Sequence, residues 1–512
     1  MESQQDVPTG LFSRELRFLL IGFLFITAFG IRLYRINEFP RNLHPGRPYH
    51  HIIIARGYYF ENLKSIPASR RQVATINKEF RPAAEPRIVE HIAVLAYRIA
   101  GGEYLWIPRL LSSIFWLIGG GVLYLLVKKI TSADAALFSL AFYLFLPYGV
   151  SASRSFMPHP LMVMMLMFSL LAIFRYYEQP STPRFVIAAI LSAIAMLIYP
   201  SALFPVFGAF LSLAFYKHGV WKAVISPKFL LFAIIALLPV AIHYSHILFS
   251  ARYLGGHIQY SLSPGILLRS FFWRGWFGRI DNILGLPALI GALLGVFMAR
   301  KGPPKALLIG LWLGYLVYVS IFNYHNATHS YYQIVFIPTV SLSLGPIGAL
   351  VANRLSQTCT QWYWRVPVLA VILMAVFLQM YKVRQEMFNP NFEREIKIAK
   401  EIGRIVEYST KTILLTEFHK SPFQYHGELS GQYWPRSGDF RARAMRGERI
   451  PTAEEQFKTL YLEHSPEYFI VTDFREYNAQ RNLRNFLTQN FPVVVNNRNY
   501  LIFDLRKSLK ER

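Results

Sequence analysis

Long apolar segments alternate with short polar connections along this chain as far as about residue 382. Each long segment approaches the roughly 20 residues with which an α-helix crosses the hydrocarbon core of a membrane. The chain has about eleven of them, at residues 17–35, 105–127, 133–151, 159–175, 184–199, 201–217, 228–249, 283–299, 305–322, 334–351 and 366–382. The pattern therefore predicts a polytopic α-helical membrane protein.

Basic residues in the short connections predict the orientation of these spans. Lys128, Lys129, Arg300, Lys301 and Lys305 all fall on the side that holds the N-terminus. Because Lys and Arg are enriched in cytoplasmic loops, we expect the N-terminus in the cytoplasm. The first apolar segment has no small-residue cleavage site after it, which is typical of a retained anchor in the plasma (inner) membrane.

Three larger polar pieces then fall on the outer side. They are the loop 36–104, the loop 250–282 and everything that follows the last span. Residues 391–512 lose the membrane pattern, and short apolar runs at 412–416, 468–473, 493–495 and 500–504 alternate with helical segments. Alternation of strands and helices predicts a small α/β domain. We thus expect a transmembrane domain over 1–385 with the outer loops 36–104 and 250–282, and an extracytoplasmic α/β domain over 386–512.

Composition supports a membrane protein with anionic partners. Of the 512 residues, 53% are hydrophobic and only 16% are charged, yet the formal net charge is +25. Basic membrane proteins favour lipid headgroups and phosphates. The charge is dispersed and forms no basic helix, so nucleic acid is a weaker interpretation. Cys359 is the only cysteine, which excludes an intrachain disulfide.

The first outer loop concentrates ionisable residues. A helical stretch from Ile88 to Ile99 has one apolar face, which predicts an amphipathic helix on the membrane surface with Glu85 before its start. Solvated side chains are the plain alternative for such a loop, and an acid before a helix often only offsets the helix dipole. The candidate residues are His44, Arg47, Tyr49, His50, His51, Arg56, Glu85, Glu90 and His91.

Two further clusters lie at the outer ends of other spans. One joins Arg154 and His159 around two prolines, and the other joins His329, Tyr331 and Tyr332. A proline-rich turn and an aromatic belt at the membrane interface are the structural alternatives. Arg274 lies in the second outer loop. No H-E-x-x-H motif and no cysteine pair is present, so no recognised metal motif is predicted.

Taken in order, these motifs resemble the GT-C glycosyltransferases, in the family 39 and aminoarabinose-transferase-like branch. The resemblance is carried by Y-x5-A-R-G from Tyr49, the Glu85-Pro86 pair, R-L-L-S from Arg109, R-S-F-x-P from Arg154 and T-H-x-Y-Y from Thr328. Such enzymes move a sugar from a polyprenyl-phosphate carrier to a lipid, glycan or protein acceptor outside the cytoplasm. The resemblance fixes no cofactor and leaves room for a divalent cation.

The resemblance also implies roles for the candidate residues. The leaving phosphate needs cations and the acceptor hydroxyl needs a general base. The substrate-binding candidates are Arg47, Tyr49, Arg56, Arg154, Arg274, His329, Tyr331 and Tyr332, and the catalytic candidates are Glu85, His50, His51 and His159.

Two carboxylates expected in the family are absent. His44 to Pro48 holds none before Tyr49, and His159 follows Pro158 where an acid is often found. Glu85 is therefore the leading candidate for the base, and a histidine can substitute because imidazole titrates near neutral pH. The absent acids also motivate a binding or assembly subunit without turnover. A transporter of lipid-linked substrates is disfavoured, because the spans are nearly free of carboxylates and no repeat is seen.

Overall fold

The computed structural model describes residues 10–38, 46–81, 85–250, 264–358, 361–387, 392–416, 420–445 and 449–507. The chain forms two compact units. The first contains Met1–Leu43, Ala83–Val89 and Leu105–Phe388, and the second contains His44–Pro82, Glu90–Tyr104 and Asn389–Arg512. The second unit thus combines most of the first outer loop with the C-terminal segment. The division of the chain near residue 385 into a transmembrane domain and an extracytoplasmic domain stays a prediction.

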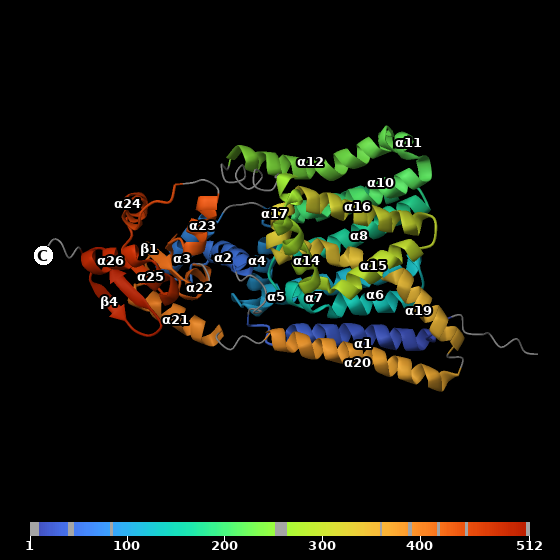
Figure 1. Ribbon diagram of the computed structural model, residues 1–512, viewed down its shortest axis with the longest axis horizontal. Helices are drawn as coiled ribbons and strands as arrows, with labels where there is room; N and C mark the ends of the chain where they lie inside the picture. Colours follow the sequence, from blue (N-terminus) through green and yellow to red (C-terminus); the bar gives the residue numbers. More distant parts are fainter. Residues whose placement is uncertain are drawn as a thin grey trace, which may run out of the picture. The chain divides into compact units, whose positions relative to one another are not determined.

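The first unit is a bundle of helices (Figure 1). In chain order it contains α1 (Arg14–Leu33), α5 (Trp106–Ile130), α6 (Ala133–Phe145), α7 (Pro147–Ser153), α8 (Pro158–Glu178), α9 (Thr182–Ile198), the 3-10 turn η1 (Pro200–Ala202), α10 (Leu203–His218), α11 (Val220–Val224), α12 (Pro227–Ser250), η2 (Pro264–Leu268), α14 (Ser270–Leu284), α15 (Leu286–Met298), α16 (Pro303–Ile321), α17 (Asn323–Thr328), η3 (Ser330–Val335), α18 (Phe336–Ser343), α19 (Gly345–Thr358) and α20 (Trp362–Met387).

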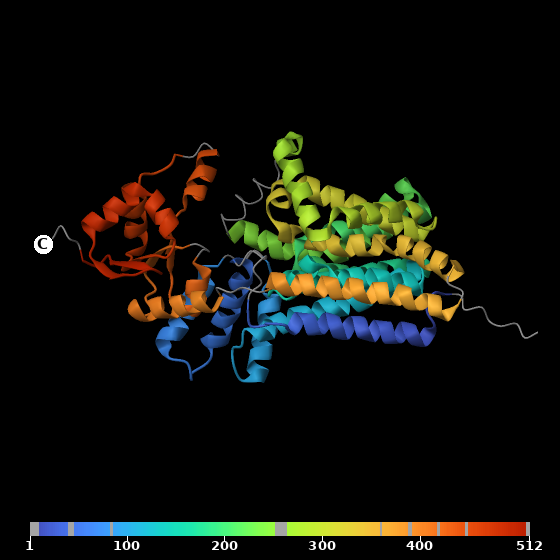
Figure 2. The same cartoon turned by 60° about the horizontal axis from the view of Figure 1, so that its bottom comes forward.

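The predicted membrane spans are confirmed in kind, but the described residues contain eight to ten of them and not the eleven predicted. Among the described residues, eight helical runs are long and apolar enough to cross a membrane, or ten if each of two bent helix pairs counts as one span. The predicted span at 184–199 corresponds to the shorter apolar helix α9. The helices α1 and α20, which are far apart in the sequence, run side by side in both views (Figure 1 and Figure 2). Ile31, Val150, Val383 and Met387 form a buried contact cluster there.

Two spans are broken, which the apolar pattern alone did not predict. α6 and α7 meet at 63°, and α14 and α15 meet at 90°. The first break precedes Pro147, because a residue before proline is driven out of the helical conformation. The second break is at Gly285, whose positive φ of 79° favours glycine, and Pro287 follows in the first turn of α15.

The helices α10 and α16 approach each other closely through glycines. A Cβ added at Gly310 would overlap the carbonyl oxygen of Gly208 and the side chain of Ser212. A Cβ at Gly314 would likewise overlap the backbone at Phe204. Small residues at such contacts let membrane helices gain packing energy where water supplies no hydrophobic driving force.

The second unit contains the outer-loop helices α2 (Gly46–Glu61), α3 (Ala68–Glu79) and most of α4 (Ile88–Ala100), together with a five-stranded sheet in the order β2-β1-β3-β5-β4. Its remaining elements are α21 (Phe392–Ile405), β1 (Thr412–Leu415), α22 (Ser421–His426), β2 (Gly431–Tyr433), α23 (Ser437–Met445), α24 (Ala453–His464), β3 (Tyr468–Val471), α25 (Phe474–Ala479), α26 (Arg481–Asn490), β4 (Val493–Asn496) and β5 (Leu501–Asp504).

The three central strands β1, β3 and β5 are buried on both faces, as their continuous apolar runs predict, whereas the edge strand β4 is largely exposed. β2, β1 and β3 are parallel, whereas β5 and β4 are antiparallel to their neighbours. Because successive side chains of a strand alternate between faces, Ile413 and Leu415 join one core and Leu414 joins the other. The predicted α/β fold of the C-terminal segment and its four predicted strands are confirmed, and β4 and β5 pair as an antiparallel hairpin.

The close contact of α10 and α16 yields a test. We expect Gly310→Leu to lower the apparent Tm of the detergent-solubilised protein, with a loss of stability of about 3 kcal/mol, because the leucine must push two backbones apart. Gly22→Leu in α1 is the matched control, since a Cβ there meets nothing within 4 Å. Equal melting temperatures for the two variants would contradict the packing described here.

Candidate functional site

Both helix breaks of the first unit open onto one cavity of about 750 Å³. Its walls come from the α6–α7 break, the α14–α15 break, η3 and α20. Irregular backbone within a membrane protein is tolerated where it lines a cavity or is covered by protein. The bends therefore shape a chamber as large as the pockets that usually hold small ligands or cofactors.

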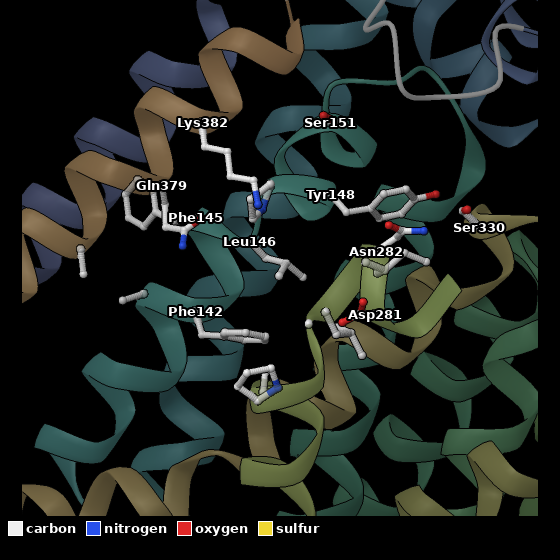
Figure 3. A pocket seen from close by; sticks show the side chains of 18 of the residues that line it. Phe142, Phe145, Leu146, Tyr148, Ser151, Asp281, Asn282, Ser330, Gln379 and Lys382 are labelled. Atoms are coloured by element: carbon white, nitrogen blue, oxygen red, sulfur yellow. The ribbon is translucent and has the colours of Figure 1, made fainter. Parts of the chain in front are cut away.

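The cavity has an apolar wall and a polar end. Figure 3 shows Lys382 and Gln379 on one side, with Tyr148, Asn282, Asp281 and Ser330 on the other. Arg279 contributes a second cation. The apolar wall consists of Phe142, Phe145, Leu146, Ile283, Leu284, Pro287, Ala288, Ala375 and Val376. An amphipathic ligand with an anionic head matches this division.

Asp281 stabilises the helix break that lines this cavity. Its Oδ1 accepts a hydrogen bond of 3.1 Å from the backbone N–H of Leu286, directly after the break at Gly285. The carboxylate thus caps the start of α15 while its residue lines the cavity. The lining contains two cations, Lys382 and Arg279, and one carboxylate, so its formal charge is positive.

Two of the predicted clusters meet beside this cavity. His159 is the second residue of α8 and is 3% exposed. The centroid of its ring lies 4.2 Å from that of Tyr199 and 5.8 Å from that of Tyr331. The ring centroid of Tyr331 lies 5.6 Å from that of His329 and 4.8 Å from that of Tyr332. The neighbouring residue Ser330 lines the cavity, so this aromatic cluster borders its wall.

Arg154 is fully buried and links the end of α7 to the segment that follows α1. Its NH2 group donates to the carbonyl oxygen of Tyr34 at 2.5 Å, and its own carbonyl accepts from Nε of Arg109 at 3.0 Å. Arg274 is exposed on α14. Glu85 is half-buried before α4 and lies within electrostatic range of Tyr244 on α12.

The other predicted cluster lies in the second unit. Nδ1 of His51 donates to Oε1 of Glu90 at 2.7 Å, and both side chains are only 2% exposed. The His50 ring lies 5.0 Å from that of His51. A histidine oriented by a carboxylate in this way has the arrangement of a general base and its positioning group. His44 lies outside the described residues, and Arg47 is half-buried.

Arg56 has structural partners. Its Nε donates to both carboxylate oxygens of Glu103, at 2.8 and 2.9 Å, and its NH1 donates to the carbonyl oxygen of Tyr425. The guanidinium also lies 3.6 Å from the centre of the Tyr425 ring. Although burial opposes it, Glu103 raises the pKa of Arg56 above its ordinary value. Arg56 thus joins α2 to Glu103 and Tyr425, and its role in substrate binding stays a prediction.

Sequence reasoning missed several of these residues. Lys382, Arg279 and Tyr148 were not singled out, although a lysine at the end of an apolar span is a usable signal. Glu90 was noticed without its pairing to His51, because a contact between residues of different helices leaves no local pattern. The described residues contain no group of three or more His, Cys, Asp and Glu side chains that could hold a metal ion.

His426 gives the second unit a pH dependence. Burial, with Arg56 and Lys400 nearby, lowers the pKa of His426 to about 3, and Nε2 accepts a hydrogen bond from the Tyr49 hydroxyl at 2.9 Å. The unfolded chain takes up this proton near pH 6.5, so stability falls as the pH drops from about 6.5 towards 3. We expect a loss of about 2 kcal/mol at pH 4.5. His426→Gln should show a smaller change in Tm between pH 7 and pH 4.5, and an unchanged difference would contradict the assignment.

Comparison with known proteins places these features in context. The family model of dolichyl-phosphate-mannose-protein mannosyltransferases matches residues 84–246, less than half of the chain. Glu85, Arg154 and His159 lie inside the matched stretch. No curated relative matches the sequence.

Solved structures share the fold across most of the chain. ArnT from Cupriavidus metallidurans bound to undecaprenyl phosphate is 13% identical, with a TM-score of 0.62 and coverage of 96% of this chain and 98% of that one. The oligosaccharyltransferase AglB from Archaeoglobus fulgidus, in complex with an inhibitory peptide and a dolichol-phosphate, is 10% identical, with a TM-score of 0.56 and coverage of 94% and 73%.

A further structure of the Archaeoglobus fulgidus oligosaccharyltransferase contains zinc and sulfate. It is 11% identical, with a TM-score of 0.53 and coverage of 93% of this chain and 71% of that one. The resemblance to the GT-C glycosyltransferases predicted from the sequence is thus confirmed, in fold over most of the chain and in sequence over residues 84–246.

Proposed function

We propose that this protein is a membrane glycosyltransferase that moves a sugar from a polyprenyl-phosphate carrier to a lipid, glycan or protein acceptor. The observation that carries the proposal is the cavity at the two helix breaks, which combines an apolar wall with Lys382 and Arg279. A polyprenyl chain suits the wall, and its phosphate suits the cations. The fold shared with an ArnT that binds undecaprenyl phosphate supports this choice of donor.

In the proposed reaction the acceptor hydroxyl attacks the anomeric carbon of the donor sugar. A new C–O bond forms while the bond from that carbon to the phosphate oxygen breaks, and the electron pair leaves with the phosphate. Cations near the phosphate stabilise the charge that develops there. The proton of the acceptor hydroxyl passes to a general base.

Glu85 is the proposed base, because it is a half-buried carboxylate in the first unit and in the stretch that matches the family. His51, oriented by Glu90, is the alternative base from the second unit. His50 and His159 are further candidates among the predicted catalytic residues. We propose that the C-terminal segment faces the outside of the plasma membrane and that the N-terminus is cytoplasmic.

This proposal leaves open a divalent cation at the donor phosphate. The archaeal structure with zinc and sulfate raises the question of a divalent cation, but no cluster among the described residues offers it three ligands. Lysine and arginine can meet the charge of the phosphate with or without such a cation.

Replacing Lys382 tests the donor site. We expect Lys382→Met to weaken binding of a polyprenyl phosphate roughly 10- to 100-fold, because a charge-assisted hydrogen bond is lost. Native mass spectrometry of the purified protein with undecaprenyl phosphate measures the retained lipid. Lys222→Met, at an exposed lysine of α11, is the matched control. Equal retention by both variants would exclude Lys382 from the phosphate site.

Replacing Glu85 tests the base. Glu85→Gln should lower kcat by about 10²- to 10⁴-fold and leave donor binding and folding intact, since only proton transfer is removed. The control is Glu79→Gln, at an exposed acid that ends α3. If Glu85→Gln keeps its turnover, Glu85 is not the base, and His51→Gln and Glu90→Gln become the next variants to measure.

A further inference from the structure

The short segment 421–429, which we call the clamp segment, contacts the outer-loop helices through most of its polar groups. It consists of α22 and the three residues that follow. Arg81 donates to Oε1 of Gln424 at 2.7 Å, and Nε2 of Gln424 donates to Oδ1 of Asn77 at 2.8 Å. Nδ2 of Asn77 in turn donates to the carbonyl oxygen of Leu429 at 3.0 Å. This chain of bonds is largely buried, so each member that lost its partner would carry a desolvation cost.

The clamp segment also reaches the helix that carries the paired histidines. Tyr49, beside His50 on α2, donates its hydroxyl proton to His426. Arg81 lies 3.5 Å from Nδ1 of His50 while it donates to Gln424. The same segment therefore supports α2 directly and also through Arg81.

A second set of bonds between the clamp segment and α2 is centred on Arg56 and Glu103. Glu103 accepts from Arg56 and also from the Tyr425 hydroxyl at 2.7 Å, so one carboxylate joins α2, the end of the outer loop and the clamp segment. Burial and then Glu103 raise the pKa of Tyr425 well above its ordinary value, which keeps the phenol protonated as a donor.

The clamp segment packs closely against α21. A Cβ at Gly403 of α21 would overlap the carbonyl oxygen of Gly427, and a Cβ at Gly427 would crowd the carbonyl oxygen of Ala399. Such a close backbone approach leaves the clamp segment little freedom to shift against α21. The core of the C-terminal sheet continues this packing, because Phe423 and Leu429 join the same cluster as Leu414 and Ile470.

We propose that the clamp segment positions α2 and α3, so that the C-terminal segment sets the geometry of His50, His51 and their surroundings during sugar transfer. The inference rests on the proposed function. The residues of the clamp segment touch no substrate, and they act through α2 and α3. The C-terminal segment is then required for turnover even where membrane insertion succeeds without it, because a misplacement of about 1 Å at a reacting group can cost about 100-fold in rate.

The ion pair of Arg70 with Glu428 allows a test by charge reversal. Nε of Arg70 donates to Oε2 of Glu428 at 2.5 Å, and a second guanidinium nitrogen bonds the other oxygen. The pair lies at the rim, with side chains 42% and 21% exposed, so reversal leaves the core intact. We expect Arg70→Glu and Glu428→Arg each to lower kcat roughly 10- to 100-fold with little change in KM for the donor. The double variant should recover most of the loss.

Hydrogen exchange on the full-length protein in nanodiscs supplies a readout that does not depend on activity. Each single reversal should speed exchange over residues 46–79, and the double variant should restore protection. Arg449→Glu is the matched control, because it breaks an exposed pair with Glu455 in the same unit and away from the clamp segment.

The outcomes separate this inference from the proposed function. If the wild-type protein transfers no sugar, the proposed function fails, and exchange alone then reports on the clamp segment. If the wild type is active and the single reversals keep its kcat, the positioning role is wrong. A loss of folded protein with unchanged kcat per folded molecule would make the contact merely structural and would also overturn the proposal.

Discussion

Backbone groups inside a membrane must find partners within the protein, and this requirement governs the end of the first unit where α1 meets the α6–α7 break. Where a span breaks, carbonyl groups lose their helical donors. Arg32 is fully buried and donates to the carbonyl oxygens of Ala28 and Leu144 at 2.8 and 3.0 Å, the latter directly before the α6–α7 break. Its Nε also donates to Ser153 at 2.8 Å. A buried guanidinium thus replaces the donors that the broken helix cannot supply.

Arg109 and Arg154 extend the same principle. Arg109 donates to the carbonyl oxygens of Ile36 and Arg154, while Arg154 donates to that of Tyr34. Together the three arginines fasten the end of α1 to the α6–α7 break, and that break is one wall of the cavity. The cations that line the cavity, Lys382 on α20 and Arg279 on α14, are a separate set.

The sequence predicted the elements better than their contacts. Apolar runs located the spans and the strands at 412–416 and 468–473, because burial on both faces leaves a continuous signal. The edge strand β2, with three residues, and the six-residue α22 were too short for any period to appear. Pro147 and Gly285 did carry the signals of broken helices, yet only coordinates show that both bends face one cavity. The pairing of Arg70 with Glu428 joins residues 358 positions apart and has no local trace.

The central claim is that this protein consumes a polyprenyl-phosphate-linked sugar. Lipid mass spectrometry on membranes from cells that lack the protein, compared with the same cells carrying the wild-type chain, tests this most directly. The account predicts that one polyprenyl-phosphate sugar accumulates without the protein and returns to its normal level when the protein is restored. Unchanged levels of every lipid-linked sugar would contradict it.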